Sequence, residues 1–241
     1  MPFRRAGFLA LLLSLLLAAC GEEQASAPNT PIAGPAEKAP TSNPQIPVRS
    51  GKGFDFYVLS LSWSPSYCEA EGADANRQQC ASGRPYAFVV HGLWPQFERG
   101  SPADCPVRET DVAPGIVSDI LPIMPSSGLI RYQWRKHGSC AGLSQEDYFD
   151  VLRAARTRVA IPAEFQRLEA YRTVRASEVE AAFLKSNQGL AKDAVAVTCD
   201  RRYLREVRIC LTKGLEFRAC PEIDRRDCRL DKAVMPPVRG G

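Results

Sequence analysis

The chain has 241 residues, 45% of them hydrophobic, with a formal net charge of +4, nine cysteines and two histidines. This length allows one domain with appendages or two small domains, and the composition supports a sizeable folded core. The net charge is too small to indicate a nucleic-acid partner, and two histidines without a Cys-x-x-Cys pair argue against a zinc site. Nine cysteines favour an oxidising compartment.

Residues 1–19 fit a secretory signal peptide, because arginines precede an apolar run from Phe8 to Leu17 that is short for a membrane span. The run ends in Leu-Ala-Ala before Cys20, which resembles the bacterial lipoprotein cleavage motif. In that motif the cysteine thiol is acylated and becomes the new N-terminus. We expect Cys20 to be lipidated; an ordinary signal peptide with a chance cysteine is the alternative.

Residues 20–52 are rich in proline and alanine and contain nothing that could form a core. We expect a lipidated N-terminus followed by a disordered tether. The folded domain should then cover residues 53–235, followed by a flexible tail at 236–241.

The first half of the domain predicts two strands. Phe54–Trp63 is rich in aromatic and β-branched residues and predicts a strand buried on both faces. The polar stretch Cys68–Gly83 predicts a loop. Tyr86–His91 predicts a second strand, which Gly92 and Pro95 are expected to end.

Helices are predicted over Val112–Leu121 and Gly128–His137. Ser144 is expected to cap a third helix, and Ser177 with Glu180 to start a fourth.

Ala194–Cys199 and Tyr203–Leu211 predict a late hairpin of strands, followed by a tail rich in cysteine. Strands and helices do not alternate regularly, which favours an α+β class with a central, mainly antiparallel sheet flanked by helices.

The two histidines, His91 and His137, each precede a glycine and lie near a tryptophan, which suggests an acid–base pair brought together by folding. Gln133 lies four residues before His137, so the two would share a helix face, with Lys136 on its flank. Gly138 is expected to end this helix in a left-handed conformation.

Three stretches resemble the ribonuclease T2 family. His91-Gly92-Leu93-Trp94-Pro95 and Trp134-x-Lys136-His137-Gly138-Ser139-Cys140 resemble its paired active-site motifs, and Phe54 to Pro65 resembles its first core strand. The resemblance covers residues 53–230 and implies a ribonuclease T2-like fold.

The resemblance also implies roles. His137 would be the base for the 2′-hydroxyl, His91 the acid for the leaving oxygen, and Lys136 would neutralise the charged phosphorane. Trp94 matches the family tryptophan that stacks on a base. Alone, each of these residues would be read as structural or as a solvated charge.

Three positions depart from the family pattern. Gln133 stands where members often have glutamate, and Tyr132 where many have a third histidine. Gln96 replaces an acidic base-recognition residue of some members. We assign Gln133 to the catalytic group, and Tyr132 and Gln96 to substrate binding.

Four disulfides are expected in the domain. Eight cysteines allow 105 pairings, but Cys105 and Cys140 match a family pair that would fix the spacing of the two imidazoles. The expected pairs are Cys68–Cys80, Cys105–Cys140, Cys199–Cys228 and Cys210–Cys220.

The leading hypothesis is an endoribonuclease that cleaves single-stranded RNA to 2′,3′-cyclic phosphates and then 3′-phosphates, with low base specificity. RNA carries its own nucleophile, so no metal or cofactor is expected, and DNA should not be a substrate. We expect a monomer that is lipid-anchored on the periplasmic face of a bacterial membrane, or free in the periplasm or outside the cell. Alternatives are a catalytically weak member that binds RNA or a protein partner in the envelope, and a purely structural envelope lipoprotein.

Overall fold

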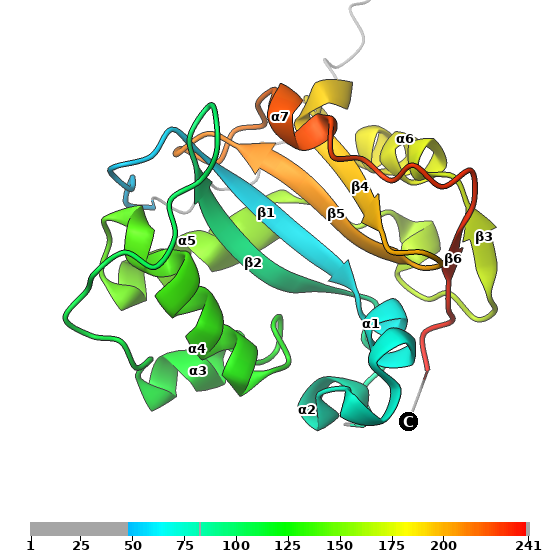
Figure 1. Ribbon diagram of the computed structural model, residues 1–241, viewed down its shortest axis with the longest axis horizontal. Coiled ribbons are helices and arrows are strands. Elements are labelled where there is room, and N and C mark those ends of the chain that lie inside the picture. Colours follow the sequence, from blue (N-terminus) through cyan, green and yellow to red (C-terminus); the bar gives the residue numbers. More distant parts are fainter. Residues whose placement is uncertain (1–47, 82, 240–241) are drawn as a thin grey trace, which may run out of the picture. The chain divides into compact units, whose positions relative to one another are not determined.

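The computed structural model describes residues 48–81 and 83–239. The expected signal peptide, Cys20 and most of the tether lie outside these residues. The centre of the domain is an antiparallel sheet with the strand order β2-β1-β5-β4, drawn in Figure 1. Its strands are β1 (Phe56–Trp63), β2 (Phe88–Gln96), β4 (Val195–Cys199) and β5 (Leu204–Leu211). A second, two-stranded sheet pairs β3 (Arg172–Val174) with β6 (Ala233–Met235).

The helices cluster around this sheet. They are α1 (Ser64–Glu71), α2 (Arg77–Cys80), α3 (Pro114–Ile120), α4 (Ser127–Lys136), α5 (Gln145–Arg158), α6 (Ala176–Ser186) and α7 (Pro221–Asp224). Short 3₁₀ turns lie at η1 (Gly72–Asp74), η2 (Gly138–Ala141), η3 (Ala163–Phe165) and η4 (Lys192–Ala194). None of the helices in the described part of the chain has the length and apolarity needed to cross a membrane. The antiparallel sheet and the helices around it confirm the α+β class.

The two faces of the sheet differ in how they are covered. Alternate residues of β1 enter the main core: Tyr57, Leu59, Leu61 and Trp63. Side chains of α3 to α6 also contribute to this core. Figure 1 shows α5 passing behind β1 and β2 on that side. On the opposite face a much smaller apolar cluster forms around Phe56 and Val58, with Trp94 packed at its margin. The lightly covered face leaves room for a site.

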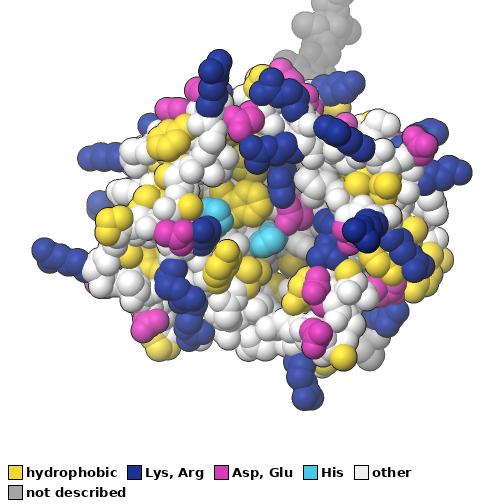
Figure 2. All heavy atoms as spheres, viewed as in Figure 1, with side chains coloured by type: hydrophobic (Ala, Val, Ile, Leu, Met, Phe, Trp, Pro, Cys, Tyr) yellow, Lys and Arg dark blue, Asp and Glu magenta, His cyan; other side chains and the backbone are white. Residues whose placement is uncertain are grey.

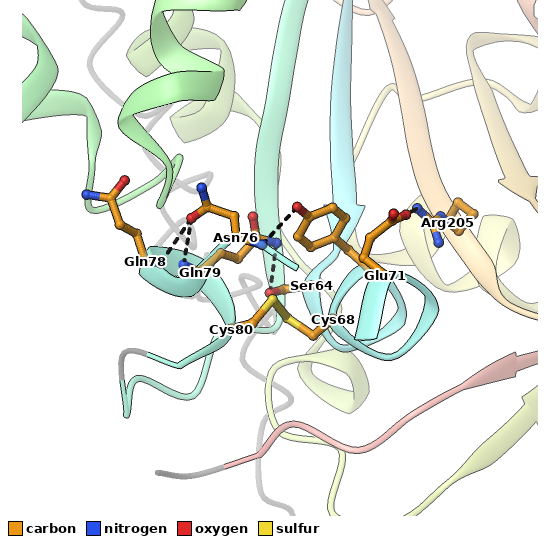
Figure 3. Close-up of a disulfide and its surroundings, with 9 residues drawn as sticks. Ser64, Cys68, Glu71, Asn76, Gln78, Gln79, Cys80 and Arg205 are labelled. Carbon is orange, nitrogen blue, oxygen red and sulfur yellow. Dashed lines mark hydrogen bonds and ion pairs between the residues drawn. A yellow bond between two sulfur atoms is a disulfide. The ribbon is translucent and has the colours of Figure 1, made fainter. Parts of the chain in front are cut away.

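The expected loop at Cys68–Gly83 is wrong, because α1, η1 and α2 fill most of it. The side chain of Asn76 caps α2 by accepting hydrogen bonds from the backbone N–H groups of Gln78 (3.0 Å) and Gln79 (3.3 Å), as Figure 3 shows. Polar residues that look like a loop here serve as a helix cap. The Cys68–Cys80 disulfide joins α1 to α2.

The start of α5 is confirmed and the start of α6 is corrected. The Ser144 hydroxyl accepts a hydrogen bond from the Asp147 N–H at 3.1 Å, as expected for a cap. In α6, however, the carboxylate of Glu178 accepts from the Arg175 N–H at 3.0 Å, so this helix begins before Ser177.

All four expected disulfides are present: Cys68–Cys80, Cys105–Cys140, Cys199–Cys228 and Cys210–Cys220. The longest loop, between Cys105 and Cys140, spans 35 residues. Closing a loop of that size contributes roughly 3–4 kcal/mol in the chain-entropy model.

The domain extends beyond both expected boundaries. The Lys52 N–H donates to the Ala141 carbonyl at 2.9 Å, so residues before 53 pack on the fold. At the other end, the Trp63 indole N–H donates to the Pro236 carbonyl at 3.0 Å, and the Val238 N–H donates to a carbonyl at 2.7 Å. Residues 236–239 are therefore part of the domain rather than a free tail.

Candidate active site

Strand β2 was expected to end at His91, but it continues to Gln96. The sequence pattern placed a stop at Gly92 and Pro95, yet both lie within the strand and pair with β1. Because β2 is the edge of the sheet, a proline there removes no hydrogen bond that a further strand would need.

His91 is the extra residue of a β-bulge. Ser60 of β1 pairs with Gly92, whereas the next residue, Leu61, pairs with Val90, so His91 has no opposite partner. A bulge of this kind bends the strand and re-aims one side chain. His91 consequently lies on the lightly covered face, with its side chain 35% exposed.

A carboxylate on another strand holds His91. The Nδ1 atom of His91 is hydrogen-bonded to Oε1 of Glu206 in β5. The other oxygen of Glu206 accepts from Nε (2.9 Å) and Nη2 (2.8 Å) of Arg208. Burial alone would raise the pKa of Glu206, but its hydrogen bond to His91 and the charges of His91 and Arg208 lower it to about 2. This carboxyl is therefore ionised at any working pH.

The second histidine lies just past the end of α4, which ends at Lys136 rather than at His137. The expected left-handed Gly138 is wrong, because this glycine lies inside the turn η2 and has no positive φ. Glycine is needed there for packing. A Cβ atom would lie 2.7 Å from the rings of Trp134 and Tyr148.

His137 has surroundings opposite to those of His91. Its Nδ1 atom is buried and has no hydrogen-bond partner among the described residues. Burial lowers the pKa of His137 to about 4, and the charges of Lys136 and His91 act in the same direction, whereas Asp104 raises it. The imidazole is thus neutral over most of the pH range in which the fold is expected to work.

Trp94 packs against both histidines. Its ring centroid is 5.6 Å from that of His91 and 5.5 Å from that of His137. Its indole N–H donates to Oε1 of Gln133 at 2.8 Å, and the guanidinium of Arg208 lies 5.2 Å from the ring. In Figure 2 the two histidines, in cyan, lie close together near the middle of a hollowed face, with basic side chains around them.

Gln133 is buried, at 1% exposure, and its amide holds Trp94. Its contact with His137 is a backbone hydrogen bond, from the His137 N–H to the Gln133 carbonyl at 3.0 Å. Gly92 makes this arrangement possible, because a Cβ atom there would overlap both the Gln133 amide and the Trp94 nitrogen.

Lys136 carries its charge at the rim of the site, and its ammonium group is paired with Asp104. The hydrogen bond and the charge of Asp104 raise the pKa of Lys136. Asp104 is fixed in turn, because its N–H donates to the Lys136 carbonyl at 2.9 Å and its neighbour Cys105 is bonded to Cys140. The disulfide therefore ties this acid–lysine pair to the segment that carries His137.

The remaining predicted residues divide in two. Tyr132 is 48% exposed on α4 and is free to meet a ligand. Gln96 is 9% exposed, and its amide donates to the Pro95 carbonyl at 2.8 Å, so it is engaged within the fold. Trp134 is a core residue, as its position suggested, and donates to the Glu109 carbonyl at 2.7 Å.

Comparison with known proteins now adds to this geometry. Residues 54–220 match the family model described as the Ribonuclease T2 family. The chain is 36% identical over 181 residues to a ribonuclease of Aeromonas hydrophila, covering 72% of this chain and 80% of that protein. It is 27% identical over 208 residues to Ribonuclease I of Escherichia coli K12, covering 66% of this chain and 75% of that protein.

The chain belongs to the ribonuclease T2 family. As a member it is an endoribonuclease.

Solved structures agree on the fold of this ribonuclease. An RNase-related protein from Calystegia sepium superposes with a TM-score of 0.63 at 21% identity, covering 78% of this chain and all of that chain. RNase NT in complex with 5′-AMP gives a TM-score of 0.59 at 24% identity, covering 77% of this chain and all of that one. The expected ribonuclease T2-like fold is confirmed.

Sequence reasoning missed three charged residues at the site of this ribonuclease: Asp104, Glu206 and Arg208. In β5 the charged positions alternate with buried Val207 and Ile209, which places Glu206 and Arg208 on the face opposite the core. This alternation can be read from the sequence, but it is the same in any strand with one face exposed to solvent, so it does not indicate a site. Asp104 carries no local signal, because the fold and the Cys105–Cys140 bond bring it to Lys136.

A cavity of about 130 Å³ opens beside His91 and Glu206. Its other walls come from α1, α2 and their connection, from α4 and from β5, and include Tyr67, Asn76 and Gln79. Figure 3 shows two of these residues, Asn76 and Gln79, close to Ser64, with Arg205 beside Glu71 on the other side of the close-up.

Proposed function

We propose that this ribonuclease cleaves single-stranded RNA by transesterification to a 2′,3′-cyclic phosphate, which it then hydrolyses to a 3′-phosphate. The observation that carries the proposal is the pair of imidazoles that contact Trp94 in opposite electrostatic surroundings. His91 is hydrogen-bonded through Nδ1 to an ionised carboxylate, so a negative charge lies beside the proposed acid. His137 is buried beside a lysine, which favours its neutral form.

The first step balances with these two groups alone. The 2′-O–H bond breaks and its proton passes to neutral His137, while the 2′-oxygen bonds to phosphorus. The P–O5′ bond breaks, and the departing oxygen takes the proton from His91. In the second step the roles reverse. His91 accepts a proton from water as the water oxygen bonds to phosphorus, the P–O2′ bond breaks, and His137 returns its proton to the 2′-oxygen.

Lys136 supports the charge that develops on the phosphate. Its ammonium is paired with Asp104 in the free protein, at a position where the side chain of Lys136 is 34% exposed. A phosphate can therefore displace an exposed carboxylate from a cation that already faces the site.

The cavity beside His91 lies on the side from which the leaving nucleoside departs. Its tyrosine and amide groups suit a base edge and a base face. Dinucleoside monophosphates that differ only in the leaving nucleoside measure this contribution, and a spread of kcat/KM under about tenfold would support low base specificity.

One experiment tests the reaction. The purified domain is incubated with RNA and with a DNA of the same sequence, each with and without EDTA, and the product ends are examined by mass spectrometry. We expect RNA to be cut to cyclic phosphates with no effect of the chelator, and DNA to stay intact because it lacks the 2′-hydroxyl. RNA binding without turnover would instead favour a catalytically weak, RNA-binding protein.

We also propose that Cys20 is acylated and anchors the domain on the periplasmic face of a bacterial membrane. The motif around Cys20 supports this, and two or more acyl chains give stable anchoring. Cys20→Ser should release soluble enzyme or block processing. Unlipidated wild-type protein, by mass spectrometry of material from the native host, would contradict the anchor.

A further inference from the structure

We propose that Glu206 is a positioning residue that fixes Nδ1 of His91 and aims its ring, and that the small side chain of Ser62 lets the two meet across β1. The proposal rests on the transesterification above, in which His91 is the acid. It adds a group on β5 to a site so far built from β2 and the end of α4.

The strand register explains how this contact forms. Glu206 and Val89 both pair with Ser62, and Arg208 and Gly92 both pair with Ser60, so β1 separates β5 from β2. Two strand spacings put β2 and β5 roughly 9–10 Å apart. A histidine and a glutamate span that gap only if the residue between them is short.

Both intervening residues on this face of β1 are serines, Ser60 and Ser62. The bulge also contributes. It removes His91 from the pairing with β1, so that its side chain reaches across β1 to Glu206. A branched side chain at position 62 would stand between the imidazole and the carboxylate.

The hydrogen bonds set the chemistry of this contact. Nδ1 of His91 is hydrogen-bonded to Oε1 of Glu206, and Nε and Nη2 of Arg208 donate hydrogen bonds to Oε2. With Nδ1 committed to the carboxylate, Nε2 is the nitrogen left to protonate the leaving oxygen. The side chain of Glu206 is only 10% exposed, so water screens this pairing weakly.

Three other titratable groups lie near His91: His137, Arg205 and Tyr67. His137 acts electrostatically on the same site from the end of α4. Arg205 and Tyr67 line the shared cavity, and Arg205 is itself paired with Glu71 and Asp200. Glu206 is therefore the carboxylate in direct contact with His91.

The test compares two substrates in the Glu206→Gln variant. On a dinucleoside monophosphate, whose alkoxide must be protonated to leave, we expect kcat/KM to fall roughly ten- to hundredfold, chiefly through kcat. On uridine 3′-(para-nitrophenyl phosphate), whose phenolate leaves without a proton, we expect a loss under about threefold.

Glu98→Gln is the matched control, because Glu98 also forms a two-point pair with an arginine, Arg218, at 2.9 and 3.0 Å but does not contact His91. It should leave both substrates unaffected. Ser62→Val is a second route to the same effect with Glu206 intact, and it keeps the proposal testable if Glu206→Gln unfolds in a thermal melt.

The outcomes separate two failures. Wild-type protein that cleaves neither substrate overturns the proposed function. Active wild type, with folded variants that lose both substrates equally or lose neither, overturns the role of Glu206 and leaves the reaction standing.

Discussion

His91 and His137 are the same residue type, each followed by glycine, yet the fold treats them in opposite ways. His91 lies on a bulged edge strand and is bonded to an ionised carboxylate. His137 lies at the end of α4 with a buried, unpartnered Nδ1 and a pKa of about 4. The same residue type is thus placed beside a carboxylate in one case, and in the other is buried beside a lysine, as an acid and a base require.

The largest expected effect comes from removing either member of this pair. His91→Ala and His137→Ala should each lower kcat/KM on RNA by roughly two to four orders of magnitude, the range for a general acid or base. The double variant should lose less than the product of the two, because both residues serve one step. Single-turnover cleavage of a dinucleotide measures this, and a near wild-type rate in either variant removes that residue from the site.

The para-nitrophenyl ester distinguishes the acid from the base, because its leaving group departs without a proton. His137→Ala should lose activity on both substrates because the 2′-hydroxyl still needs a base, whereas His91→Ala should lose far less on the ester. The reverse pattern would exchange the two roles.

Gly92 leaves room for the Gln133 amide and for the Trp94 ring, which packs against both histidines. Gly92→Ala should push the Gln133 amide and the Trp94 ring out of place, since the added methyl overlaps both. We expect roughly a ten- to hundredfold loss of kcat/KM from the misplacement, with all four disulfides still formed. Gly115→Ala is the control, because a Cβ atom there meets nothing within 4 Å.

These residues also show how far sequence reasoning reaches. Short motifs predicted the acid–base pair, and strand patterns predicted β1 and the β4–β5 hairpin closely. The pattern missed the bulge at His91, because a bulge depends on register with a partner strand. It missed Glu206 for a related reason, since its contact with His91 passes over a third strand.

Two local rules also gave wrong answers. Gly138 was expected to adopt a left-handed conformation, but it is small so that Trp134 and Tyr148 can pack against it. The four-residue spacing was expected to place Gln133 and His137 on one helix face, but His137 lies past the end of α4, and the buried Gln133 amide accepts a hydrogen bond from the Trp94 indole. In both cases tertiary packing outweighed the local rule.

A moderate effect is expected from giving His137 a carboxylate of its own. Gln133→Glu places a buried acid at the Trp94 indole, one turn before His137. The base must be neutral, so wild-type kcat/KM should fall as the pH drops through about 4, the pKa of His137. A nearby carboxylate favours the imidazolium, so the variant should lose activity at a higher pH.

The pH profile on a dinucleotide measures this shift, and Gln166→Glu on the exposed surface is the control. Movement of the alkaline limb instead would mean that the base and acid are exchanged. An unchanged profile would mean that the side chain at 133 does not influence His137.

The smallest effect concerns Asp104, which pairs with Lys136 at the rim on the His137 side. An exposed pair of this kind is weak, so freeing the lysine with Asp104→Asn should lower KM for RNA by no more than about fivefold. The acid limb should move slightly to lower pH as well, because Asp104 raises the pKa of His137. Lys136→Ala should act oppositely on KM, since it removes the cation itself. If Asp104→Asn raises KM, the carboxylate is holding Lys136 in its productive position rather than competing with the phosphate, and His137 then depends on an acidic neighbour as His91 does.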